Sequence, residues 1–289
     1  MSKVAGALEF EKRLRTSDKT PSSPSGDVIR LARETSQLPE VQTSKPTIEL
    51  TKVDRSIVCI SDPDSPGAEQ YRKLRAQILP AMRQTAKSTV LVTSADIGEG
   101  KSITAVNLAI ALAMEIDHTV LLVDADLRKP SIHTYLGIRV DWGLSEYLQG
   151  LVSISDCLIK TGIGKLVLLP AGKPPPNSAE LLSSNRMKKL AQEMKHRYND
   201  RYVIYDSPPI LACADTISLC SYADGILLVI QAARTAEKTV KEALALLPGK
   251  PMLGVVYNNV PDFMCTSPYP HDYYRYSKCT ASTTSANGG

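Results

Sequence analysis

Six short apolar segments alternate with helical segments between residues 65 and 260, and this alternation restricts the chain to a small set of folds. Strands that are apolar throughout, each followed by a helix, are typical of a mostly parallel sheet with helices on both faces. Ligands of such α/β sheets bind beyond the carboxyl ends of the strands. We expect strands at 89–92, 119–123, 166–169, 202–205, 226–230 and 253–257, helices at 68–82, 102–115, 179–197, 216–222 and 237–246, and short helical turns at 131–136 and 144–148.

The segment after the first expected strand has the pattern of a phosphate-binding loop. It reads ADIGEGKS from Ala95 to Ser102, with alanine in place of the usual first glycine. Small residues let backbone N–H groups close around phosphate oxygens, and the following helix adds partial positive charge. This pattern predicts a P-loop NTPase fold in which Lys101 contacts the β- and γ-phosphates of ATP and the Ser102 hydroxyl binds Mg²⁺. The residues expected to bind the nucleotide are Gly98, Glu99, Gly100, Lys101, Ser102 and Ile103.

Three aspartates lie directly after other expected strands. Asp124 and Asp126 follow the second strand, and Asp206 follows the fourth. Alternate residues of an extended chain project to one side, so Asp124 and Asp126 share a face if the chain stays extended. Carboxylates beside a phosphate loop suit Mg²⁺ binding and acceptance of a substrate proton. We expect Ser102, Asp126 and Asp206 to hold Mg²⁺, Asp124 to accept the proton, and Lys101, Asp124, Asp126 and Asp206 to form the catalytic set.

Tyrosine dominates the aromatic residues, with 12 Tyr against 2 Phe and 1 Trp. Four of these tyrosines lie within eight residues near the C-terminus, in the sequence YPHDYYRY. A phenol with a pKa near 10 is mostly protonated at neutral pH, so a tyrosine acceptor needs a nearby carboxylate or metal. The segment is either a solvated aromatic tail or a cluster of phosphate acceptors, namely Tyr269, Tyr273, Tyr274 and Tyr276.

Glu69, Arg72 and Arg75 are spaced three residues apart, which places them on one face of the expected helix at 68–82. Taken alone, this spacing favours ion pairs within the helix, each worth about 0.2–0.5 kcal/mol.

These features together resemble the bacterial tyrosine kinases (BY-kinases) of polysaccharide export and assembly. The resemblance covers residues 65–276 and rests on the phosphate loop, LLVDADLR, YVIYDSPP, the E-x-x-R-x-x-R pattern, PAG with PPPNSAELL, and the terminal tyrosines. It implies Mg-ATP as phosphate donor, autophosphorylation of the tail tyrosines, and contact of Asn258 with adenine. It also implies a ring-shaped homo-oligomer assembled through Glu69, Arg72 and Arg75. One departure is Ser178, where relatives usually carry proline.

The resemblance also implies a partner. Many relatives carry a membrane-spanning activator domain that this sequence lacks, so the chain looks like the stand-alone cytoplasmic type. That type is activated by a separate membrane polysaccharide co-polymerase, or chain-length regulator, which recruits it to the inner face of the membrane. The long polar N-terminal segment is similar to the tyrosine autokinases of exosortase-linked exopolysaccharide systems.

An ATPase switch of the septum-positioning or partition type, without protein kinase activity, is the alternative function. Those P-loop proteins carry a signature lysine five residues before the loop lysine, and this chain has Asp96 there. An acid removes the cation that stabilises phosphate across their dimer interface. The tyrosine cluster and Asp96 therefore favour the kinase.

Composition excludes several other classes. A net charge of +4 is too small an excess to indicate a nucleic-acid-binding protein. The six cysteines form no C-x-x-C pair, which argues against a zinc site. No run approaches the roughly 18 apolar residues of a membrane span, and the N-terminus lacks the apolar core of a secretory signal. We expect a cytoplasmic protein with a polar, largely disordered extension at 1–60, a P-loop kinase domain at 61–262 and a flexible tail at 263–289.

Overall fold

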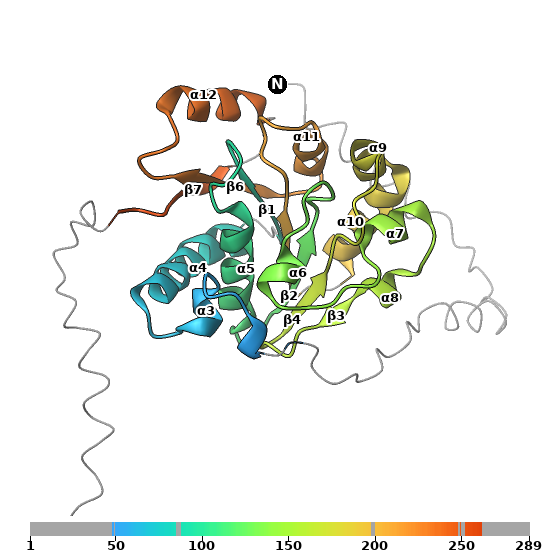
Figure 1. The fold of residues 1–289 in the computed structure, drawn as a ribbon, viewed down its shortest axis with the longest axis horizontal. Helices are drawn as coiled ribbons and strands as arrows, with labels where there is room; N and C mark the ends of the chain where they lie inside the picture. Colours follow the sequence, from blue (N-terminus) through green and yellow to red (C-terminus); the bar gives the residue numbers. More distant parts are fainter. Residues whose placement is uncertain are drawn as a thin grey trace, which may run out of the picture. The chain divides into compact units, whose positions relative to one another are not determined.

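The structure, a computed structural model, describes residues 48, 50–84, 88–197, 200–247, 249 and 252–261. These residues form a seven-stranded sheet in the order β3-β4-β2-β5-β1-β6-β7, flanked by helices (Figure 1). All neighbouring strands are parallel except β3 and β4, which pair antiparallel. The strands are β1 (Thr89–Ser94), β2 (Thr119–Asp124), β3 (Ile159–Lys160), β4 (Leu166–Leu169), β5 (Arg201–Asp206), β6 (Gly225–Gln231) and β7 (Met252–Asn258).

The other elements of the fold are helices. The long ones are α4 (Pro66–Gln84), α5 (Lys101–Ala113), α10 (Asn185–His196) and α12 (Glu237–Leu246). The short ones are α3 (Val58–Ser61), α6 (Ile132–Tyr135), α7 (Leu144–Gln149), α8 (Ile154–Cys157), α9 (Ser178–Ser183), α11 (Asp215–Cys220) and a 3-10 turn at Leu50–Lys52.

Two apolar cores lie on opposite faces of the sheet, because successive strand residues point to opposite sides. On β1, Val90 and Val92 join the core formed with α4 and α5, whereas Leu91 joins the core formed with α7, α9, α10 and α11. All six residues of β1 are buried. This burial explains why the central strands are mainly apolar, and it confirms the expected mostly parallel sheet covered on both faces.

The expected helix at 179–197 is wrong as a single element. It breaks at Ser184, which has extended backbone (φ −67°, ψ 156°) and separates α9 from α10. The Ser184 side-chain oxygen accepts a hydrogen bond from the Met187 backbone N–H at 3.1 Å, so it caps α10. A serine cap satisfies one of the donors at a helix start, and this local bond competes with a continuous helix.

Part of the chain before residue 61 packs on the first core. Ile57 is fully buried, and the fully buried Asn107 of α5 holds the backbone on either side of it. The Asn107 carboxamide accepts from Cys59 N–H and donates to Ser56 O, both at 3.0 Å. Polar groups buried in this way are stable only when paired. Among the described residues, no helix is long and apolar enough to cross a membrane.

Candidate active site

The phosphate-binding loop connects β1 to α5, which begins at Lys101. Gly98 and Gly100 have φ of +82° and +91°, in the region that side chains rarely adopt. A Cβ atom on Gly100 would lie 2.1 Å from Asn258 Nδ2, so only glycine fits there. Ala95 is fully buried and is not among the residues with positive φ, so the loop tolerates alanine at its first position.

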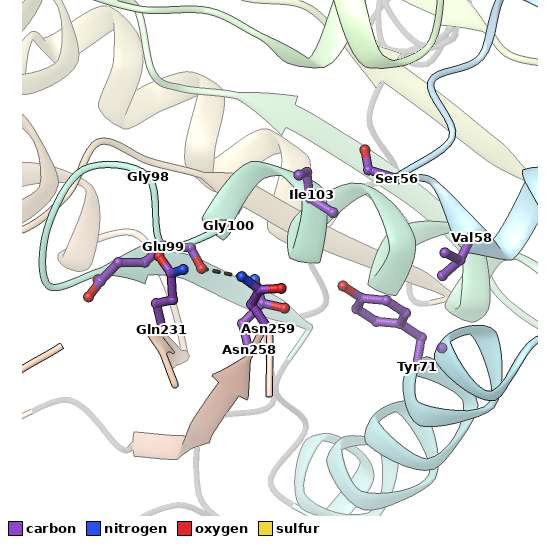
Figure 2. Close-up of a pocket in the computed structure, with 11 residues that line it drawn as sticks. Ser56, Val58, Tyr71, Gly98, Glu99, Gly100, Ile103, Gln231, Asn258 and Asn259 are labelled. Atoms are coloured by element: carbon purple, nitrogen blue, oxygen red, sulfur yellow. Dashed lines mark hydrogen bonds between the residues drawn. The ribbon is translucent and has the colours of Figure 1, made fainter. Parts of the chain in front are cut away.

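Glu99 shapes the loop through its buried side chain. One carboxylate oxygen accepts the Asp96 N–H at 2.8 Å, and the other accepts the Thr235 hydroxyl. The Glu99 carbonyl accepts from Asn258 Nδ2 at 2.9 Å, which joins the loop to the end of β7 (Figure 2). The Asp96 carboxylate, at the position of the signature lysine of partition ATPases, accepts the N–H of the next residue at 2.7 Å.

Lys101 lies against two of the three predicted carboxylates. Its Nζ is 2.8 Å from Asp126 Oδ2, 3.6 Å from Asp206 Oδ1 and 3.0 Å from Ser102 Oγ. Burial alone lowers the pKa of Lys101, but the charges of Asp206 and Asp126 outweigh this effect and raise it above its usual value. Lys101 is therefore a cation at the centre of this cluster.

The sheet register explains why the carboxylates meet. Asp124, the last residue of β2, is paired with Asp206, the last residue of β5. Both side chains are fully buried, and Asp126 is 4% exposed. Three acids thus gather at the carboxyl edge, as the sequence predicts for an α/β ligand site.

Asp124 and Asp126 differ in their surroundings. The two oxygens of Asp124 accept backbone N–H groups of Asp126 and Ile132, at 3.3 and 3.2 Å. Burial and the charge of Asp206 raise the pKa of Asp124 well above 3.8. Asp126 instead contacts Lys101 and accepts the Lys129 N–H at 3.0 Å. A carboxylate with a raised pKa therefore lies beside one that pairs with the lysine.

The Asp206 carboxylate suits a cation other than lysine. Both of its oxygens are buried, and neither has a hydrogen-bond partner among the described residues. Burial raises its pKa, which Lys101 partly offsets. Within the same part of the chain, no three His, Cys, Asp or Glu side chains are placed to hold a metal by themselves. This donor set fits Mg²⁺, which usually takes one or two protein carboxylates and completes its shell with phosphate and water.

Two cavities flank the phosphate loop and share Gly98, Gly100 and Ile103. The first, of about 410 Å³, lies between the loop, the end of β7 and helices α3 and α4. Figure 2 shows Asn258 on the loop side of this cavity and the Tyr71 ring on the α4 side. Its apolar wall, together with the amides of Gln231, Asn258 and Asn259, suits a nucleobase.

The second cavity, of about 290 Å³, contains the charged groups. Its polar lining includes Lys101, Ser102 and Asp126. Tyr135 and Pro209 contribute apolar surface to the same cavity. It therefore offers a place for an aromatic acceptor close to the phosphate loop.

The residues of the E-x-x-R-x-x-R pattern contact groups of their own chain. Arg72 Nε is 2.6 Å from Glu69 Oε2, the intrahelical pair favoured by the spacing alone. Arg75 instead reaches α5, with Nη1 donating to Ala111 O at 2.9 Å and Nε lying 3.3 Å from Glu115 Oε1. Their role in a subunit contact stays a prediction, and Tyr269, Tyr273, Tyr274 and Tyr276 lie outside the described residues.

Tyr71, Ser56 and Val58 line the first cavity and are not among the residues predicted from the sequence. They lie 30 or more positions before Lys101, in or just before helices that pack on α5, and no local pattern marks such a contact. Gln231, at the end of β6, was detectable in principle because it lies at a carboxyl strand end.

Several known proteins are similar to this chain in sequence and in fold. A family described as "AAA domain" matches residues 88–247. The tyrosine-protein kinase YwqD of Bacillus subtilis is 41% identical over 211 residues, 72% of this chain and 87% of that protein. The tyrosine-protein kinase ptk of Acinetobacter johnsonii is 34% identical over 218 residues, 75% of this chain but 29% of that longer relative. The kinase domain of Escherichia coli tyrosine kinase ETK superposes with a TM-score of 0.68 at 27% identity, covering 82% of this chain and 89% of that one.

Proposed function

The chain belongs to the bacterial tyrosine-protein kinases, a family of P-loop enzymes, and we propose that it phosphorylates tyrosines of its own C-terminal segment with Mg-ATP. The observation that carries this proposal is the group of three buried aspartates around Lys101, of which Asp126 lines the second cavity together with Lys101 and Ser102. Phosphoryl transfer needs little covalent chemistry from the protein and depends on positioning and charge stabilisation.

In this proposal each residue of the cluster has a separate role. Lys101 leaves its carboxylate partners to contact the β- and γ-phosphates, while the loop glycines let the backbone approach them. Ser102, Asp126 and Asp206 hold Mg²⁺, which when bound neutralises charge on the phosphates. Asn258 and Ile103 contact the adenine side of the nucleotide in the larger cavity.

Asp124 is the proposed proton acceptor. A general base works best when its pKa lies near the working pH. The raised pKa of Asp124 brings this carboxylate closer to neutral pH than an ordinary aspartate. Each of its oxygens accepts one backbone N–H, which leaves further lone pairs for a substrate proton.

The test is phosphotyrosine formation. Purified protein is incubated with Mg-ATP, and the sites are mapped by mass spectrometry. We expect phosphate on the tail, and none after Tyr269, Tyr273, Tyr274 and Tyr276 are replaced by Phe. Lys101→Arg serves as the inactive control because it keeps a cation beside the aspartates while altering the phosphate contact. Absence of phosphotyrosine in the wild type, with ATP hydrolysis retained, would favour the ATPase switch.

Transfer between subunits follows from the reach of the tail. About fifteen residues separate Asn258 from Tyr273, so an extended tail spans up to roughly 50 Å. We propose that a subunit in a ring offers its tyrosines to the next one, through contacts of the α4 face that carries Glu69, Arg72 and Arg75. Each phosphate adds about −1.5 to −2 charge, which repels the acidic site and makes the reaction self-limiting.

A mixing experiment separates transfer in trans from transfer in cis. A Lys101→Arg chain that keeps its tyrosines is combined with an active chain whose tail tyrosines are Phe. Phosphate on the inactive chain supports the proposal, and Arg72→Ala on both chains should reduce it. Arg72 is the better choice than Arg75, because its side chain is 41% exposed and Arg75 holds α5 in place. Label confined to unmixed wild type would contradict it.

We further propose a membrane polysaccharide co-polymerase as activator, with a cytoplasmic kinase recruited to the inner face of the membrane to regulate exopolysaccharide polymerisation or export. The matched region forms only 29% of the Acinetobacter relative, so that kinase carries a long additional part of the chain outside the matched region. Co-purification with such a membrane protein, and stimulation of phosphotyrosine by its cytoplasmic segment, test this partner.

A further inference from the structure

One buried carboxylate outside the catalytic set joins three of the loops that follow strands. Asp215, the first residue of α11, is fully buried. Arg128 donates to it with both arms, Nε to Oδ2 at 3.0 Å and Nη2 to Oδ1 at 2.9 Å. The Ser178 hydroxyl donates to Oδ2 at 2.8 Å. Such bidentate, charge-assisted bonds are the stronger kind of hydrogen bond and also fix orientation.

Each partner comes from a different loop at the carboxyl edge of the sheet. Arg128 lies two residues after Asp126, in the loop after β2, and Ser178 begins α9 in the segment after β4. Asp206 is the last residue of β5, and Asp215 lies at the end of the loop that follows it. Asp215 thus links the loop that contains Asp126 to the loop that follows Asp206, the two proposed magnesium ligands.

The loop between Asp206 and Asp215 is itself held firmly. Thr93 of β1 and Thr216 of α11 both donate hydroxyl hydrogen bonds to Pro208 O, at 2.9 and 2.6 Å. A displacement of Asp215 is therefore transmitted to the backbone next to Asp206. On the other side, Asp126 accepts the N–H of Lys129, the neighbour of Arg128.

We propose that Asp215, with Arg128 and Ser178, is a positioning device that fixes the relative placement of Asp126 and Asp206 for the Mg-nucleotide. This rests on the proposed function of those two carboxylates. Asp215 is a positioning residue because it contacts the loops and not the nucleotide cavities.

The state of Asp215 agrees with this role. Burial alone raises its pKa, but the hydrogen bonds from Arg128 and Ser178 outweigh burial and lower it below 3.8. Asp215 therefore stays ionised at neutral pH, and both bonds remain charge-assisted.

Ser178 gives this chain a contact that proline could not make. It is the first residue of α9, a position where proline suits the helix because no N–H is needed. Ser178→Pro therefore removes the hydroxyl while placing at the first helical position a residue type that suits it.

Asp224 provides a matched control at the opposite edge of the sheet. It also joins separate elements, accepting from Ser88 N–H, Thr89 N–H and the Thr89 hydroxyl, and it pairs with Lys195 of α10. Asp224 lies just before β6 begins, at the amino ends of the strands. Asp224→Asn should lower the stability of the fold about as much as Asp215→Asn does, without changing the placement of Asp126 and Asp206.

The experiment measures binding of a fluorescent ADP analogue to the full chain as Mg²⁺ is titrated, with thermal unfolding recorded for each variant. Outer hydrogen-bond partners of metal ligands typically change metal affinity 10–100-fold. We expect Asp215→Asn to raise the half-saturating Mg²⁺ concentration about tenfold, and Arg128→Lys and Ser178→Pro to raise it less. Asp224→Asn should leave it within twofold.

An unchanged Mg²⁺ requirement in folded Asp215→Asn would overturn the proposal, as would an equal shift in Asp224→Asn. If Asp215→Asn fails to fold, Ser178→Pro and Arg128→Lys decide the question by the same criterion. The readout does not depend on phosphotyrosine. A wild type that binds Mg-ADP but forms no phosphotyrosine would refute the proposed kinase reaction and leave this inference standing.

Discussion

Replacement of Lys101 by methionine should destabilise the ligand-free protein, although the lysine belongs to a ligand site. Only 13% of the Lys101 side chain is exposed, and it is paired with Asp126 and Asp206. Methionine has similar length but no charge, so three buried carboxylates lose their shared cation.

The magnitude follows from the burial of the pair. Removal of one partner of a buried ion pair costs about 3–5 kcal/mol, because the other charge stays buried without compensation. At low pH the loss shrinks. Lys101 lowers the pKa of Asp206, so its removal raises that pKa further above 3.8. A carboxyl whose pKa is raised on folding binds more protons when folded, so stability falls as pH rises between 3.8 and the raised pKa.

Urea unfolding of Lys101→Met at several pH values measures this effect. We expect the largest deficit above neutral pH and a smaller one near pH 5. Lys101→Arg should retain most of the stability because it keeps the charge. Lys195→Met removes a lysine from a more exposed pair and should cost about 1 kcal/mol or less, because Asp224 keeps its other donors. A Lys101→Met variant as stable as wild type at pH 8 would refute the reasoning.

Three further outcomes test the site. Gly100→Ala should abolish nucleotide binding in a fluorescence titration, because its Cβ collides with Asn258 in a loop with φ of +91°, whereas Gly254→Ala, with nothing within 4 Å, should leave binding intact. Asp124→Asn should reduce phosphoryl transfer at least tenfold more than Mg-ATP affinity, and equal losses would make Asp124 a metal ligand instead. Asn107→Ala should lower the free energy of unfolding by about 1–3 kcal/mol in denaturant, since two long-range hydrogen bonds are lost.

The sheet and the meeting of the aspartates were predictable from the sequence. Apolar strands followed by Asp124 and Asp206 place both acids at one edge of a parallel sheet, and the observed pairing of these two residues bears out that argument. The pairing of Asp206 with Lys101 is also a consequence of local pattern, because the phosphate loop follows β1, which pairs with β5.

Contacts between distant segments were not predictable in the same way. Ser184 looks like an ordinary helix residue in the apolar pattern of 179–197, and only its capping bond reveals the break. Ile57 lies in a polar region, yet it is fully buried because α5 presents Asn107 to its neighbours. Arg75 fits an intrahelical pattern but reaches the end of α5. Each depends on packing between elements, which composition and periodicity do not contain.

The contacts of Lys101 with Asp126 and Asp206 bear on how a nucleotide and a metal ion would bind. Three buried carboxylates at one point are costly, and Lys101 compensates part of their charge. When Lys101 moves to the phosphates, Asp126 and Asp206 lose that compensation unless another cation takes its place. On the proposed function, phosphate binding would thereby make the two carboxylates available to hold Mg²⁺, whose charge would replace that of the lysine. The two ligands must then favour each other's binding by the same factor, because such coupling is reciprocal.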